Sequence, residues 1–96
     1  MSPINKKKLK KLRKSLDILD NSFIKLVKKR TSIVKKVLKL KEFKNQIVDK
    51  KRINQILKKI RLKSKRIKID PKITNRIWKN MIWSYINYER KNFKKK

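Results

Sequence analysis

The chain has 96 residues and a formal charge of +28 at pH 7, because 34 lysines and arginines stand against 6 acidic residues. It contains no Cys and no His, which excludes disulfides, thiolate catalysis, Cys-based zinc sites and the commonest general base. It also has no Gly, so a glycine-rich phosphate loop is impossible and electrostatics is the main catalytic chemistry that remains.

The positive charge has two interpretations. It is typical of proteins that bind nucleic acid or anionic membranes. However, the chain has 27 Lys, 14 Ile and 8 Asn but no Ala, and these abundant residues are the ones that A/T-rich codons specify. Mutational drift could therefore supply much of the charge, which makes the charge weak evidence of function.

The pattern predicts a first helix from about Lys6 to Phe43. Its apolar residues follow one another in alternating steps of three and four, as in the seam of a helix that buries one stripe: Leu9, Leu12, Leu16, Leu19, Phe23, Leu26, Ile33, Val37 and Leu40. Such a helix would be about 57 Å long, roughly twice the diameter of a small domain. It cannot bury its whole seam within one short chain, so we expect a symmetric dimer.

A second helix is expected after Asn45-Gln46 interrupts the pattern, with Asp49 as its N-cap. One face carries apolar residues and ends at a serine, before the basic stretch 63–68: Ile53, Ile56, Leu57, Ile60 and Ser64. Asp70-Pro71 predicts the start of a third helix, because Asp caps well and Pro suits the first helical position.

The third helix should run to about Lys91, and Glu89 continues its apolar stripe of Trp78, Ile82 and Tyr85. This acid therefore points where a core residue is expected. Residues 92–96 are predicted to be a frayed basic tail. The sequence thus predicts one all-α domain over residues 1–96, with one very long and two shorter helices in an intertwined homodimer.

We expect a cytoplasmic protein that does not bind a membrane. No apolar run approaches the roughly 20 residues that a membrane-spanning helix needs. The segment Met1–Lys14 is basic but lacks the apolar region of a secretory signal.

Arg30 is the residue that the pattern explains least. It occupies the seam position between Leu26 and Ile33, where an apolar side chain is expected. A guanidinium stays ionised, and removing it from water without a paired anion costs on the order of several kcal/mol. The nearest acids of the same helix are Asp20 and Glu42, more than a turn away. The balancing anion is therefore expected from another segment or from a ligand.

Other charged residues have a spacing that suits a shared anion. Lys41 follows Arg30 by three turns, within about 20° of the same face and about 16 Å along the axis. Arg13 lies about 25 Å before Arg30, but an antiparallel partner could bring its own Arg13 there. Asp49 and Arg52 follow a turn that could fold them back toward Lys41.

Each of these residues also has an ordinary structural explanation. Arg13 can pair with Asp17 at the i+4 position. Lys41 and Arg52 can be solvated surface residues, and Asp49 can serve only as an N-cap. Glu89 can pair with Arg76 or Arg90, or be exposed near a frayed helix end.

Taken together, these residues resemble those of the all-helical chorismate mutases, which are small intertwined dimers of three-helix chains. The resemblance covers Leu12 to Glu89. It rests on the Arg–Arg–Lys spacing of 17 and 11 residues, the later Asp–x–x–Arg segment and the apolar third helix that ends in an acid: Leu12-Arg13, Asp17, Asp20, Leu26 to Arg30, Lys41, Asp49 to Arg52, Ile69-Asp70 and Glu89.

The resemblance implies conversion of chorismate to prephenate, a Claisen rearrangement that needs no cofactor or metal. It implies that Arg30 and the partner's Arg13 bind the two carboxylates of the substrate, that Arg52 supports the carboxylate end, and that Asp49 meets the ring hydroxyl. Lys41 and Glu89 would face the ether oxygen, where negative charge develops.

The sequence departs from the family in three places. Ile53 stands where an acid usually follows the arginine, and Tyr85 stands where a small hydroxyl residue is common. Glu89 replaces the Gln of many relatives, and a carboxyl group donates a hydrogen bond only when protonated. We therefore expect activity to rise toward acid pH.

Three other functions are considered. A nucleic-acid-binding or ribosome-associated helical protein accounts for the charge but predicts a basic stripe, not an arginine within a seam. A plain coiled-coil dimer would use Arg30 to set its register. An isochorismate pyruvate-lyase shares the family fold, and Glu89 favours the mutase over it. Nucleic acid is the less favoured partner.

Overall fold

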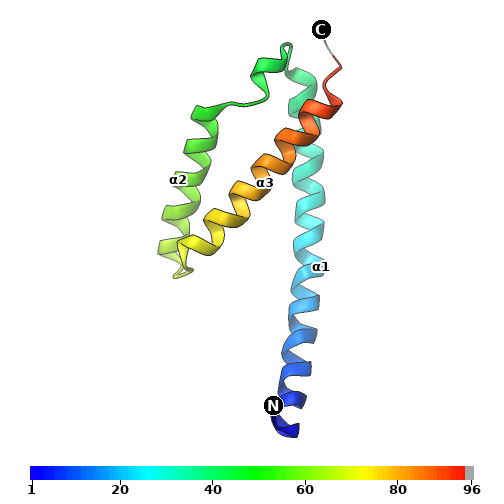
Figure 1. The fold of residues 1–96 in the computed structure, drawn as a ribbon, viewed down its shortest axis with the longest axis vertical. Coiled ribbons are helices and arrows are strands. Elements are labelled where there is room, and N and C mark those ends of the chain that lie inside the picture. Colours follow the sequence, from blue (N-terminus) through cyan, green and yellow to red (C-terminus); the bar gives the residue numbers. More distant parts are fainter. Residues whose placement is uncertain (95–96) are drawn as a thin grey trace. The chain divides into compact units, whose positions relative to one another are not determined.

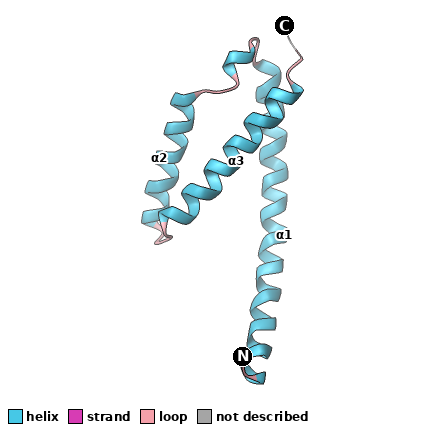
Figure 2. Cartoon of the chain, in the orientation of Figure 1, coloured by secondary structure: helices cyan, strands magenta, loops and turns pink. Residues whose placement is uncertain are grey.

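The computed structural model describes residues 1–94, in which helices are joined by short loops (Figure 2). It has three α-helices and one short 3₁₀ helix: α1 (Pro3–Leu40), η1 (Lys44–Gln46), α2 (Lys50–Arg66) and α3 (Pro71–Asn92). No strand occurs within residues 1–94. The all-α prediction with one long and two shorter helices is therefore confirmed.

The chain divides into two compact units, and α1 contributes to both. The first unit is Met1–Ile33 and the second begins at Val34. Helix α1 begins three residues before its predicted start, because the Ser2 side chain caps it: Ser2 Oγ accepts the N–H of Asn5 at 3.1 Å. It ends at Leu40, three residues before the predicted Phe43.

The predicted seam of α1 is exposed in the single chain. No residue of α1 is buried. Six seam residues of the first unit are each more than half exposed: Leu12, Leu16, Leu19, Phe23, Leu26 and Ile33. An apolar stripe of this length on one helix marks a surface that another chain covers in many helical proteins.

Helices α2 and α3 form a hairpin within the second unit (Figure 1). Both predicted N-caps are confirmed, since Asp49 accepts the N–H of Arg52 and Asp70 accepts that of Lys72, each at 3.0 Å. Lys68 lies in the connecting turn with a φ of 62°. The N–H of Lys68 bonds to Lys65 and that of Ile69 to Ser64, the two bonds of a Schellman motif. Gly usually occupies that left-handed position, and this chain has none.

The core is small and lies in the second unit. Ile47 from the loop before α2 is buried with Ile82 and Ile86 of α3. Half-buried apolar residues pack against this cluster: Val48, Ile53, Ile56, Leu57 and Phe93. At the turn end of the hairpin, the hydroxyls of buried Ser64 and half-buried Thr74 are 2.7 Å apart. The predicted apolar face of α2 therefore packs on α3, and Ser64 joins it through hydrogen bonds.

The predicted basic tail begins inside α3. Asn92 is the last helical residue, and Phe93 packs against the core. Residues 95 and 96, which complete that tail, lie outside the described residues. Among residues 1–94, no helix has the length and apolar character needed to span a membrane.

Candidate functional site

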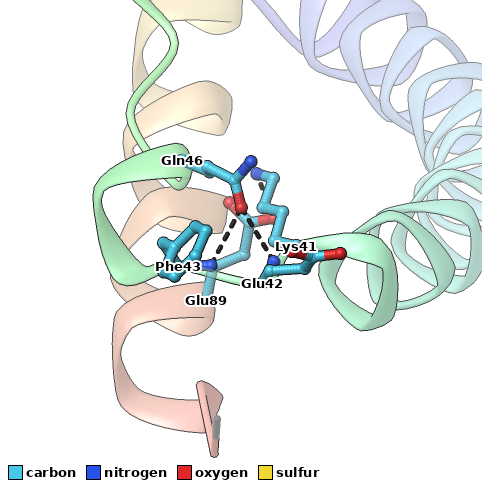
Figure 3. Close-up of polar contacts among 5 residues, drawn as sticks. All are labelled: Lys41, Glu42, Phe43, Gln46 and Glu89. Atoms are coloured by element: carbon cyan, nitrogen blue, oxygen red, sulfur yellow. Dashed lines mark hydrogen bonds and ion pairs between the residues drawn. The ribbon is translucent and has the colours of Figure 1, made fainter. Parts of the chain in front are cut away.

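Lys41 and Glu89 form an ion pair inside the second unit. The Nζ of Lys41 lies 3.0 Å from Oε1 of Glu89. The Lys41 side chain is 19% exposed and that of Glu89 is 6% exposed, so the pair is largely removed from water. Figure 3 shows the two side chains meeting, Lys41 from the residue just after α1 and Glu89 from the last turns of α3. Lys41 and Glu89 are 48 residues apart in the sequence.

The burial of Glu89 follows from its place on α3. Glu89 lies three and seven residues after Ile86 and Ile82, so the three share the face that packs in the core. A carboxylate in such a place is costly unless it is paired and hydrogen-bonded. The ammonium of Lys41 meets that requirement. The sequence prediction that Glu89 points where a core residue is expected is confirmed.

The loop after α1 positions Lys41. The N–H of Lys41 donates to the carbonyl of Leu38 at 3.2 Å, which tightens the last turn of α1. Gln46 Oε1 then accepts the N–H groups of Glu42 at 2.8 Å and Phe43 at 2.9 Å (Figure 3). Sequence reasoning treated Gln46 only as an interruption of the pattern. The available signal was a Gln at the third position of η1, from which a side chain can reach back to the backbone N–H of the N-cap residue Phe43.

The remaining predicted site residues of the second unit lie near this loop or on α3. Asp49 and Arg52 are both exposed, and the contact between them is the N-cap bond from the backbone of Arg52. Tyr85 is half-buried on α3, one turn before Glu89. Lys35 Nζ lies 5.9 Å from the ring centroid of Tyr88, the neighbour of Glu89, so the last turns of α1 contact α3 here as well.

Arg13 and Arg30 belong to the first unit, residues 1–33. Arg13 is exposed and Arg30 is half-buried. Within residues 1–94, no group of three or more acidic, Cys or His residues could hold a metal ion.

The family comparison decides what this chain is related to. The profile of the family Chorismate mutase type II matches residues 12–90, which is most of the chain. The chain belongs to the chorismate mutase type II family. No curated protein and no solved structure gives a significant match. The predicted resemblance over Leu12 to Glu89 is therefore confirmed at the level of the family.

One departure of this chorismate mutase type II chain now has a structural context. Ile53, which stands where relatives usually carry an acid, packs against the cluster of Ile47, Ile82 and Ile86. It therefore contributes apolar contact to a very small core.

We predict that Lys41→Met lowers the free energy of unfolding by about 2–4 kcal/mol, because it leaves the buried Glu89 carboxylate without its cation. Lys36→Met, at an exposed position of α1, is the matched control and should change it by less than about 0.5 kcal/mol. Urea unfolding at one fixed protein concentration measures both.

A double-mutant cycle distinguishes the loss of the Lys41–Glu89 ion pair from the effect of shortening either side chain alone. The Lys41→Met/Glu89→Leu variant should recover most of the loss, because both charges are then removed from the buried site. If the losses of the two single variants simply add, the ion pair does not stabilise the fold.

Proposed function

We propose that the chain is a chorismate mutase, which converts chorismate to prephenate. The observation that carries the proposal is the buried Lys41–Glu89 pair in a chain of the chorismate mutase type II family. This pair supplies one fixed cation and one carboxyl group. The reaction is an intramolecular rearrangement, so it needs an anion-binding, preorganised site and no nucleophile or cofactor.

The catalytic step requires stabilisation of an oxygen. As the carbon–oxygen bond of the ether breaks and the new carbon–carbon bond forms, negative charge gathers on the ether oxygen. We assign Lys41 as the donor to that oxygen, because a preorganised ammonium in a largely dry site stabilises developing charge strongly. Its contact with Glu89 holds it in place before the substrate binds. Glu89 serves as a second donor in its protonated form.

Binding of the substrate requires cations for two carboxylates. We assign these to Arg30 and to Arg13 of a second copy of this chain, with Arg52 supporting the carboxylate end, since arginine forms bidentate bonds to carboxylates. Asp49 would accept the ring hydroxyl and Tyr85 would line the pocket. Holding both ends of the substrate favours the reactive geometry.

A homodimer is part of the proposal. The exposed seam of α1 supports it, because six large apolar side chains on one helix face are each more than half exposed. Pairing of two α1 helices would remove this surface from water, at roughly 25 cal/mol per Å² of apolar area. In an antiparallel arrangement it would also carry Arg13 of one chain toward Arg30 of the other.

We expect the purified protein to consume chorismate, followed by the loss of its ultraviolet absorbance, and to release prephenate. Arg30→Ala should lower kcat/KM by roughly a hundredfold or more, because a charge-assisted bond to the substrate is worth several kcal/mol in a desolvated site. Arg76→Ala, on α3, is the matched control and should leave turnover unchanged. Absence of turnover in the wild type would refute the mutase function, and turnover of isochorismate alone would identify the lyase.

The role of Glu89 predicts a pH dependence. Only the protonated carboxyl can donate to the ether oxygen, so kcat/KM should rise as the pH falls below neutral. Glu89→Gln places a permanent donor there and should flatten the profile and raise activity at pH 7. A Glu89→Gln variant with the wild-type pH profile would remove Glu89 from the mechanism.

The shared site predicts complementation between inactive variants. Arg13→Ala and Lys41→Ala chains should each be nearly inactive. When equal amounts are unfolded and refolded together, about half of the dimers are mixed and each holds one intact site, so roughly a quarter of the wild-type activity should return. Refolding Arg30→Ala with Lys41→Ala is the control. One chain supplies both residues to the same site, so neither site of a mixed dimer is intact and no activity should return. Recovery in this control would mean that Arg30 and Lys41 of one site come from different chains. No recovery in the first mixture contradicts a site shared through Arg13.

A further inference from the structure

Gln46 makes two hydrogen bonds that determine where α1 ends. In a continuing helix, the N–H groups of Glu42 and Phe43 would donate to carbonyls four residues earlier, those of Leu38 and Lys39. In the structure both donate to Oε1 of Gln46, at 2.8 Å and 2.9 Å. One side-chain oxygen therefore replaces two helical acceptors. This accounts for the end of α1 at Leu40, although the apolar pattern continues to Phe43.

The residue after Gln46 fixes the loop to α3. Ile47 is 4% exposed and packs with Ile82 and Ile86. Glu89 lies on the same helix, one turn beyond Ile86. The loop is thus fixed to α3 at two points, through Ile47 in the core and through Lys41 on Glu89. Gln46 connects these two points. It directly precedes Ile47, and its side chain binds the N–H groups of the two residues that follow Lys41.

We propose that Gln46 is a positioning residue that keeps the Lys41 ammonium at the reacting oxygen. This inference rests on the proposed mutase function. Gln46 is exposed and its Oε1 accepts the backbone N–H groups of residues 42 and 43, so we assign it a positioning role that acts through Lys41. Without its acceptor, the two N–H groups can return to helical carbonyls or bond to water. Lys41 then samples positions away from Glu89.

The geometry gives the direction of the kinetic effect. Lys41 acts on charge that develops only in the transition state, so a loss of its placement lowers kcat and leaves KM nearly unchanged. Hydrogen bonds at an exposed loop compete with water and are individually modest. We therefore expect a roughly tenfold loss of kcat, much smaller than that expected for removal of Lys41 itself.

The test compares three substitutions in the full-length protein. Gln46→Met keeps the length of the side chain and removes the acceptor, and it should lower kcat roughly tenfold with KM within about twofold. Gln46→Glu keeps an oxygen at the same place and should retain kcat. Gln55→Met removes an exposed glutamine of α2 and should match the wild type. The amide hydrogen exchange of Glu42 and Phe43, measured by NMR, should accelerate in Gln46→Met and stay protected in Gln46→Glu.

The two readouts separate this inference from the proposed function. An inactive wild type whose Glu42 and Phe43 amides are protected by Gln46 would contradict the mutase function. An active enzyme in which Gln46→Met keeps the wild-type kcat would overturn the positioning role. A fall of kcat equal in Gln46→Met and Gln46→Glu would overturn it as well, since the acceptor would then be irrelevant.

Discussion

The second unit depends on the contact between one buried carboxylate and one lysine. Glu89 lies on the face of α3 that also carries the buried core residues Ile82 and Ile86. Leaving that carboxylate unpaired in an apolar site would be costly. The end of α1 and the loop through Ile47 place Lys41 so that its Nζ lies 3.0 Å from Oε1 of Glu89. The pairing of Glu89 also holds the Lys41 ammonium in one place and largely away from water, as the proposed rearrangement would require.

Local signals in the sequence predicted the helices well. Asp49, Asp70 and Pro71 are strong helix starts and were correctly placed, because capping depends on a few neighbouring atoms. The end of α1 was misplaced, because the apolar period continues past Leu40 while a side chain three residues beyond Phe43 takes the helical donors. The start of α1 was also misplaced, since Ser2 and its cap were overlooked in a lysine-rich segment.

The candidate site could be predicted only in part. Glu89 and Lys41 stood out by their positions in helical patterns, and their contact over 48 residues follows from the hairpin of α2 and α3. Gln46 has no periodic pattern, and its role appears only when its oxygen is seen between two amides. The net charge was a poor guide in comparison. One lysine among 27 gains a specific role from where it lies, while the charge as a whole identifies no partner.

The turn between α2 and α3 has a consequence for the way this gene can change. Lys68 adopts a left-handed conformation that costs a residue with a side chain about 1–2 kcal/mol, and Gly would avoid most of this. Gly codons begin with two guanines and require two base changes from a lysine codon. Asn also tolerates this conformation, and its codons differ from those of Lys in the third base alone. This chain already contains eight asparagines, and a more relaxed hairpin is therefore one base substitution away.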